Sequence, residues 1–192
     1  MGYQLVTPPT VEPLTLAEAK AHLRVDIADE DALINSIITA TRQYCEQITG
    51  RSLLAQQWRL VLDQFPPVIE LEKGPITAIT SVIYTDMSGA VQTAAESDYV
   101  ADLSGSLTRL TPKFGAIWPI ALPQIGSVAV NFTAGYGAAA ASVPVGLKNW
   151  MLLRIAALYN SREELVVLHR GESVAPHPFI DSLLDAYRIW RV

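Results

Sequence analysis

The sequence predicts an α+β protein in which helices from both ends of the chain flank an inserted small antiparallel sheet. Apolar residues recur at helical spacing within residues 13–53 and again within 143–192. Across 54–134, apolar and polar residues alternate as in strands, and Pro and Gly interrupt the pattern repeatedly. We therefore expect a single domain over residues 1–192, with a helical scaffold from 13–53 and 143–192 and a β-rich insertion at 54–134.

The N-terminal segment contains a capped helix followed by a longer one. Residues 1–12 carry two prolines and several β-formers, which indicates an extended arm. Thr15 and Glu18 have the spacing of a capping box, so a short helix begins there. A long helix is expected from about Asp29 to Thr49, and Gly50 is suited to terminate it. Its apolar stripe consists of Leu33, Ile34, Ile37, Ile38, Thr41, Tyr44, Cys45 and Ile48.

The middle of the chain is predicted to form short strands separated by turn residues. The expected strands cover residues around 58–62, then 68–71, 76–84, 90–93, 99–101, 107–110 and 128–132. A loop rich in Pro and Gly carries Phe114 and Trp118 before the last strand.

The C-terminal part is predicted to be helical and unusually apolar. Only three polar residues interrupt the segment Leu147–Tyr159, so a helix there must be covered on nearly all sides. A neighbouring subunit could supply part of that cover. A last helix is expected from Phe179 to the C-terminus, because large apolar residues recur there at helical spacing.

Composition excludes several function classes. The net charge is −5 and no run of Lys or Arg occurs, which argues against unspecific phosphate binding. Only 17% of residues are charged against 50% hydrophobic, which favours additional burial in an oligomer. The single cysteine, Cys45, cannot form an internal disulfide. We expect neither a signal peptide nor a transmembrane helix.

No pattern of residues indicates chemistry. His22, His169 and His177 lack metal-ligand spacing, and the motifs of hydrolases, P-loops and metalloproteases are missing. We therefore expect no catalytic, cofactor-binding or metal-ligating residue, and no enzyme. Large aromatic residues and arginines anchor many protein interfaces. The candidate interface residues on this basis are Trp118, Trp150, Arg154, Tyr187 and Trp190.

Two blocks of sequence resemble the head–tail connector family of long-tailed double-stranded DNA phages. The first block is P-L-T-L-A-E-A-K-A-H-L-R-V-D at 13–26, with D-E-D-A-L-I at 29–34 and Y-C-E-Q-I-T-G-R at 44–51. The second is F-T-A-G-Y-G at 132–137, with V-P-V-G-L-K at 143–148 and the helix that follows. The blocks occur in the family's order, on either side of a variable β-rich middle.

The resemblance implies a structural virion protein that is assembled in the host cytoplasm. Members of the family form a ring, typically a dodecamer, beneath the portal protein. The ring extends the DNA channel without sequence-specific binding and offers a surface to the next head-completion or tail protein. It implies no cofactor and no membrane partner.

Two other readings of the sequence stay open. One is a different head- or tail-completion protein of a phage. The other is a ligand-binding module on the β insertion, for which Trp58 and Trp118 exposed on one sheet face would argue. An enzyme is the most distant class, and a buried cluster of ionisable groups in a cleft would favour it.

Overall fold

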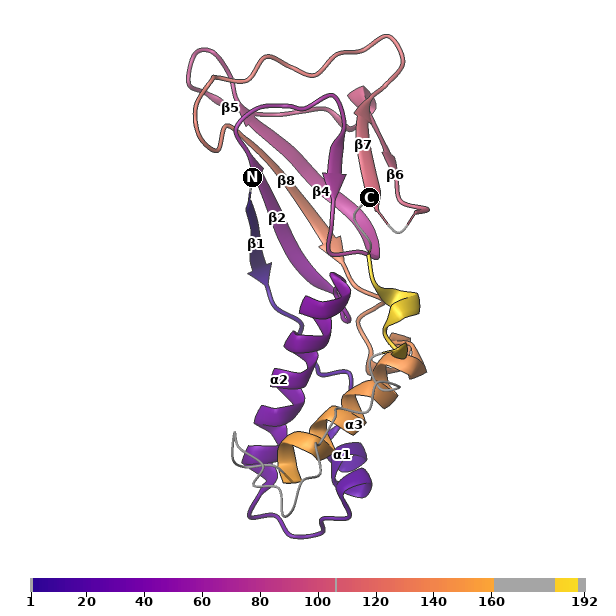
Figure 1. Cartoon of the computed structure of the whole chain (residues 1–192). Helices are drawn as coiled ribbons and strands as arrows, with labels where there is room; N and C mark the ends of the chain where they lie inside the picture. Colours follow the sequence, from indigo (N-terminus) through magenta and orange to yellow (C-terminus); the bar gives the residue numbers. More distant parts are fainter. Residues whose placement is uncertain (1, 106, 161–181, 190–192) are drawn as a thin grey trace, which may run out of the picture. The chain divides into compact units, whose positions relative to one another are not determined.

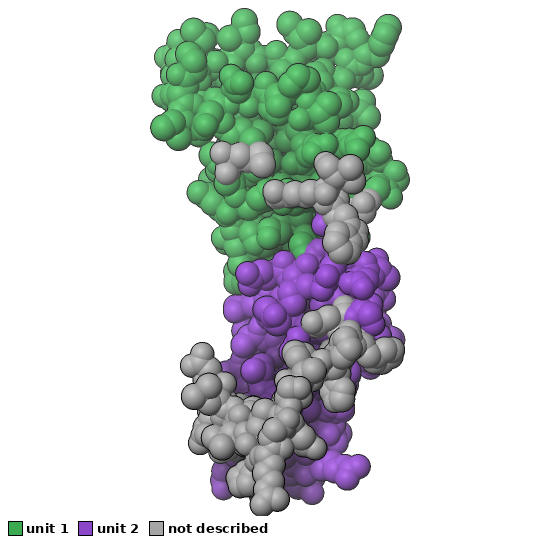
Figure 2. All heavy atoms as spheres, in the orientation of Figure 1, with its two compact units in different colours: residues 1–10, 50–138 green, residues 11–49, 139–192 purple. Residues whose placement is uncertain are grey.

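The computed structural model describes residues 2–105, 107–160 and 182–189 of the chain. It has three α-helices and two antiparallel sheets within these residues, which confirms the mixed α+β class. The chain divides into two compact units (Figure 2). We call residues 1–10 with 50–138 the sheet unit, and residues 11–49 with 139–192 the helical unit.

The helical unit contains α1 (Leu16–Leu23), α2 (Asp31–Thr49) and α3 (Val145–Asn160) (Figure 1). The capping box at the start of α1 is confirmed, and Arg24 ends that helix in a left-handed conformation with φ of 57°. Helix α2 packs against α3. Their fully buried apolar side chains are Ile34, Ile38, Cys45, Leu147, Trp150, Met151 and Ile155.

Part of the stripe predicted on α2 faces solvent. Ile34 and Ile38 are buried, but Leu33 and Tyr44 are 41% and 47% exposed. The apolar stripe of α2 is therefore wider than the part of the helix that other described residues bury. An exposed apolar margin remains on this helix.

The sheet unit contains eight strands in two antiparallel sheets. The five-stranded sheet has the order β1-β2-β8-β4-β5, with β8 in its centre, and the three-stranded sheet has the order β3-β7-β6. The strands are β1 (Gly2–Thr7), β2 (Gln56–Leu62), β3 (Ile69–Leu71), β4 (Ile76–Thr85), β5 (Val91–Thr93), β6 (Tyr99–Asp102), β7 (Thr108–Pro112) and β8 (Val128–Ala134).

The two sheets share one hydrophobic core. Leu60, Val130 and Phe132 point from one face of the five-stranded sheet towards Leu71 and Leu110 of the three-stranded sheet. Their neighbours along the strands point to the opposite face, because side chains alternate along a strand. The five-stranded sheet thus has an inner face against the core and an outer face that the three-stranded sheet does not cover.

The expected N-terminal arm is a paired strand. β1 pairs with β2, with Tyr3 opposite Leu60. The ring of Tyr3 meets Phe132 edge-on at 6.4 Å, and its hydroxyl accepts a hydrogen bond from the Glu72 amide at 2.8 Å. A half-buried aromatic side chain therefore holds the strand in register.

The backbone leaves β8 through a constrained turn at Gly135. Its φ is +135°, and a Cβ at this position would lie 2.2 Å from the carbonyl oxygen of Leu54. Only glycine avoids that overlap.

The C-terminal helix expected from Phe179 lies partly outside the described residues. Within 182–189, Asp185–Tyr187 form a 3₁₀ turn (η3), and Arg188 is extended. Ser182 is helical, so the expected α-helix is wrong only for residues 185–189 of this stretch. The Ile189 amide instead donates to the Thr49 carbonyl at 3.0 Å, which satisfies an acceptor that the end of α2 leaves open.

Candidate functional site

Trp150 and Arg154, two of the candidate interface residues, form an aromatic cluster with Tyr44 in the helical unit. Trp150 is fully buried, and its ring lies 5.9 Å from that of Tyr44. The Arg154 guanidinium stands 5.4 Å from the Trp150 ring and 5.9 Å from the Tyr44 ring. This geometry fits a cation–π contact. Trp150 thus stabilises the subunit, while Tyr44 remains half-exposed beside it.

The other C-terminal candidates are Tyr187 and Trp190. Tyr187 packs over α3 at Gly146, where an added Cβ would lie 3.1 Å from the phenol oxygen. The absence of a side chain at Gly146 therefore makes room for the phenol ring. Trp190 lies outside the described residues.

Trp118 packs in the sheet unit, on the loop between β7 and β8. Its ring stacks on Phe65 with centroids 4.9 Å apart and lies 6.2 Å from Tyr99. Its indole Nε1 is buried and has no hydrogen-bond partner among the described residues. The ring thus belongs to the edge of the core.

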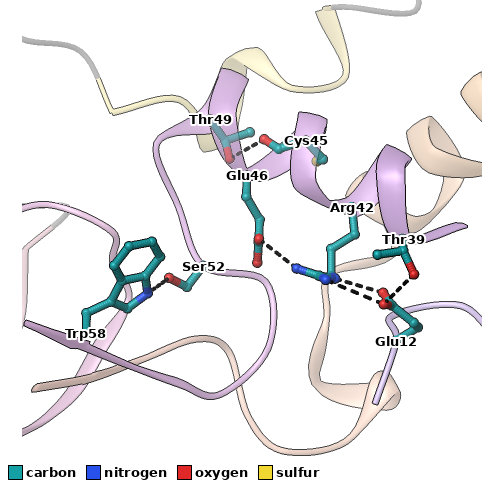
Figure 3. Close-up of polar contacts among 8 residues, drawn as sticks. All are labelled: Glu12, Thr39, Arg42, Cys45, Glu46, Thr49, Ser52 and Trp58. Atoms are coloured by element: carbon teal, nitrogen blue, oxygen red, sulfur yellow. Dashed lines mark hydrogen bonds and ion pairs between the residues drawn. The ribbon is translucent and has the colours of Figure 1, made fainter. Parts of the chain in front are cut away.

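Trp58 is also occupied by contacts within the sheet unit. Its Nε1 donates to Ser52 Oγ at 3.0 Å (Figure 3), and the Lys73 ammonium lies 5.2 Å from the ring. A ligand-binding module would need Trp58 and Trp118 as exposed platforms on one sheet face. Both rings are partly buried and packed against other residues, so this alternative loses its main support.

A buried arginine organises the polar contacts of α2. Arg42 is 7% exposed and donates to Glu12 at 2.8 Å and to Glu46 at 3.0 Å (Figure 3). Thr39 donates to the same Glu12 carboxylate at 2.9 Å. Two carboxylates thus compensate one buried cation, as burial of charge requires. The cluster holds the segment before α1 against α2.

Glu18 joins two helices of the same unit. Its carboxylate accepts from the Thr15 amide at 2.7 Å and from Lys148 Nζ at 2.9 Å. The hydrogen bond from the Thr15 amide, followed by that from Lys148, lowers the pKa of Glu18 from 4.5 to about 2. The capping box of α1 is thereby tied to α3.

The described residues offer no cluster of ligands for a metal ion. In 2–105, 107–160 and 182–189, no group of three His, Cys, Asp or Glu could hold a metal ion. Burial raises the pKa of the Cys45 thiol to about 12, so it is not a nucleophile at neutral pH. None of the described helices has the length and hydropathy needed to cross a membrane.

The most exposed apolar side chains among the described residues lie on the loop between β7 and β8, and none of them is one of the interface residues predicted from the sequence. They are Phe114 at 105%, Ile117 at 83%, Ile120 at 75% and Ile125 at 92% exposure. Large apolar residues in a loop rich in Pro and Gly, without strand or helix periodicity, are the signal that could have identified them. Such a concentration is typical of a protein interaction surface.

A hollow of about 220 Å³ lies on the outer face of the five-stranded sheet. Val61, Ala129 and Ile83 stand opposite one another on β2, β8 and β4. The small side chain of Ala129 between two larger ones leaves the depression, which Val91 and Gly126 also line. A polar row follows, in which Arg59 donates to Asn131 at 2.8 Å.

Comparisons with known proteins agree on one family. The family model described as "Phage gp6-like head-tail connector protein" matches residues 13–114. A search of curated proteins finds no match.

Solved structures cover the whole chain. The neck of an empty GTA particle computed with C6 symmetry contains a chain with 29% identity and a TM-score of 0.79. The virion of a native gene transfer agent particle gives 28% and 0.80, and the neck of a native GTA particle computed with C12 symmetry gives 26% and 0.77. Each match covers 100% of this chain and 97% of the other chain. Since the family model spans more than half of the 192 residues, the protein belongs to the phage gp6-like head-tail connector family of structural virion proteins.

Proposed function

We propose that the protein forms a ring in the neck of a virion, between the portal at the head vertex and the next head-completion or tail protein. The observation that carries this proposal is the match over the full chain to subunits of particle necks computed with C6 and C12 symmetry. A dodecamer is compatible with both symmetries. Assembly takes place in the host cytoplasm, and the finished ring remains in the virion.

The helical unit is the scaffold of the subunit in this proposal. Its buried charges and aromatic cluster are satisfied within one chain. The sheet unit exposes several large apolar side chains on its β7–β8 loop. Cyclic rings need two unlike patches on every subunit, and exposed apolar surface supplies contact energy for such patches.

The charge of the chain suits a channel through which DNA slides. A net charge of −5 without a basic run gives little counterion release on contact with phosphate. DNA therefore passes through the ring without being held or read.

Electron microscopy of negatively stained protein tests the ring directly. The purified full-length chain is imaged alone and after mixing with the portal protein of the same genome. We expect closed rings with cyclic symmetry in at least the mixed sample, attached to one end of the portal. A chain that stays monomeric in both samples contradicts the proposal.

A filter-binding assay tests the role of DNA. We expect no retention of double-stranded DNA by the protein at low salt, where electrostatic binding is strongest. Tight, salt-sensitive retention would instead favour a DNA-gripping protein.

A different completion protein of the neck is the second candidate, and attachment to a tail component without portal binding would favour it.

A further inference from the structure

Phe114 is a fully exposed aromatic side chain on a hydrogen-bonded turn. It occupies the corner of a tight turn in which the Ala116 amide donates to the Lys113 carbonyl at 2.8 Å. Gly115 provides the positive φ of 82° that the turn requires. The Lys113 amide donates to the Asp98 carbonyl at 2.9 Å, which ties the turn to the neighbouring strand region. The backbone that carries the phenyl group is thus fixed by hydrogen bonds before any partner binds, which reduces the backbone entropy lost on association.

The hollow on the outer sheet face has the volume to receive such a group, and its lining combines apolar residues with the polar Gln4, Thr85 and Ser127. Its volume is about 220 Å³, and an apolar cavity of about 150 Å³ accommodates a benzene ring. The row Val61, Ala129 and Ile83 forms an apolar floor. Arg59 lies at the rim, where a guanidinium can stack on an aromatic face.

The knob, Phe114, and the hollow belong to opposite sides of the two-sheet sandwich. Phe114 follows β7 of the three-stranded sheet, which covers the inner face of the five-stranded sheet. The hollow lies on the outer face of the five-stranded sheet. Phe114 is 105% exposed and so does not fill the hollow of its own chain. Two complementary patches on opposite sides of one unit are what a head-to-tail contact needs.

Charge near the knob is net negative, because the exposed Lys113 beside Phe114 offsets only one of two nearby carboxylates. Exposed Glu96 and Asp98 lie in the turn that binds Lys113 through its backbone. Arg59 lines the hollow, and Asp63 lies beside it, accepting a hydrogen bond from the amide of the lining residue Gly126.

We infer that the Phe114 side chain of one copy inserts into the outer-face hollow of the next copy, so that the sheet units join head to tail around the ring. The occupant of the hollow is a second copy of this chain, and the contact is heterologous. This inference rests on the proposed ring, and it assigns the subunit contact to named residues.

Cross-linking of the full-length protein tests the contact. A Lys113→Cys, Val91→Cys double variant places one thiol beside the knob and one at the hollow, while Phe114 is kept. The native Cys45 is buried and stays unreactive in the folded protein. Treatment with a short bis-maleimide under ring-forming conditions should give a ladder beyond the dimer on denaturing gels. Each single variant should give no species beyond the dimer.

Removal of the knob provides the decisive comparison. Adding Phe114→Ser to the double variant should abolish at least nine-tenths of the species larger than a monomer. Val145→Ser removes a side chain that is 70% exposed in the helical unit, and it should leave the ladder intact.

The remaining outcomes separate this inference from the proposed function. Rings that form without the cross-linked ladder, or that persist with Phe114→Ser, overturn the knob contact and leave the ring in place. A third outcome is that Phe114→Ser still forms rings but no longer binds another neck protein that the wild-type rings bind. Phe114 would then be a docking residue for that protein, which also overturns the inference. Absence of rings with and without the portal overturns both.

Discussion

Arg42 donates two hydrogen bonds to Glu12, which lies thirty residues earlier in the chain, at 2.8 and 3.5 Å. Because the arginine is 7% exposed, removing it leaves the facing carboxylates without a compensating charge. We expect Arg42→Ala to lower the free energy of unfolding by roughly 3 kcal/mol. Urea unfolding followed by circular dichroism measures the change.

Arg109 supplies the control for this prediction. Its Nε lies 3.8 Å from Glu70, and both side chains are more than half exposed. Exposed ion pairs contribute about 0–1 kcal/mol, so Arg109→Ala should have a small effect. Equal losses in the two variants would show that burial of the Arg42 cluster is not what stabilises it.

Glu18 makes the stability of the helical unit depend on pH in the acid range. Its pKa is lowered from 4.5 to about 2 in the folded protein, so the deprotonated form stabilises the fold. This contribution is present above pH 4.5 and is lost as the pH falls from about 4.5 towards 2. In Glu18→Gln, the part of the acid-induced loss of stability that comes from Glu18 should be missing. Melting temperatures measured across this pH range test the prediction.

The pH series needs a reference, because other carboxylates also titrate. Asp102 is exposed and lies in the sheet unit, and hydrogen bonds from Ser104 lower its pKa. Asp102→Asn should leave the Glu18-dependent part of the decline unchanged. A Glu18→Gln variant that declines as steeply as the wild type would rule out the carboxylate as its source.

Local signals in the sequence predicted the parts of the fold that depend on neighbouring residues. The spacing of Thr15 and Glu18 identified the start of α1, since a capping box satisfies amides within one turn. The apolar stripe likewise identified α2, whose first residue is Asp31 instead of Asp29. The pairing of β1 with β2 was not predicted, because strand pairing across more than fifty residues leaves no local pattern.

The candidate interface shows the limit of reasoning from residue type. Trp118 and Phe114 are aromatic residues of the same loop, yet Trp118 stacks on Phe65 while Phe114 is fully exposed. Composition cannot separate them, because the difference arises from the turn at Gly115 and from distant packing partners. The hollow depends on Ala129 lying between residues of two other strands, which also requires the register.

Trp150 should act on stability and not through a partner. Its side chain is fully buried beside Tyr44, so Trp150→Ala removes a large volume from the core. We expect a loss of about 3–5 kcal/mol in the free energy of unfolding. Leu158→Ala on the same helix removes a side chain that is 50% exposed, and it should cost less than about 1 kcal/mol. Thermal unfolding compares the two, and a stable Trp150→Ala variant that fails to assemble would instead support a direct interface role.

Gly135 is the glycine at which an added Cβ would meet the closest neighbouring atom, among the described glycines compared in this way. A methyl group there would lie 2.2 Å from the Leu54 carbonyl oxygen, and the φ of +135° is unfavourable for any side chain. Gly135→Ala should therefore destabilise the sheet unit by at least about 2 kcal/mol, since the loop before β2 must move away from the end of β8.

Gly89 separates the two causes of that loss. Its φ is +84°, but an added Cβ would meet nothing within 4 Å. Gly89→Ala should thus lower the free energy of unfolding only by the cost of a left-handed backbone conformation, about 1–2 kcal/mol. Urea unfolding of both variants should rank Gly135→Ala as clearly less stable. If the two lose the same amount, the close approach to Leu54 relaxes without cost, and the link between β8 and β2 is softer than its geometry indicates.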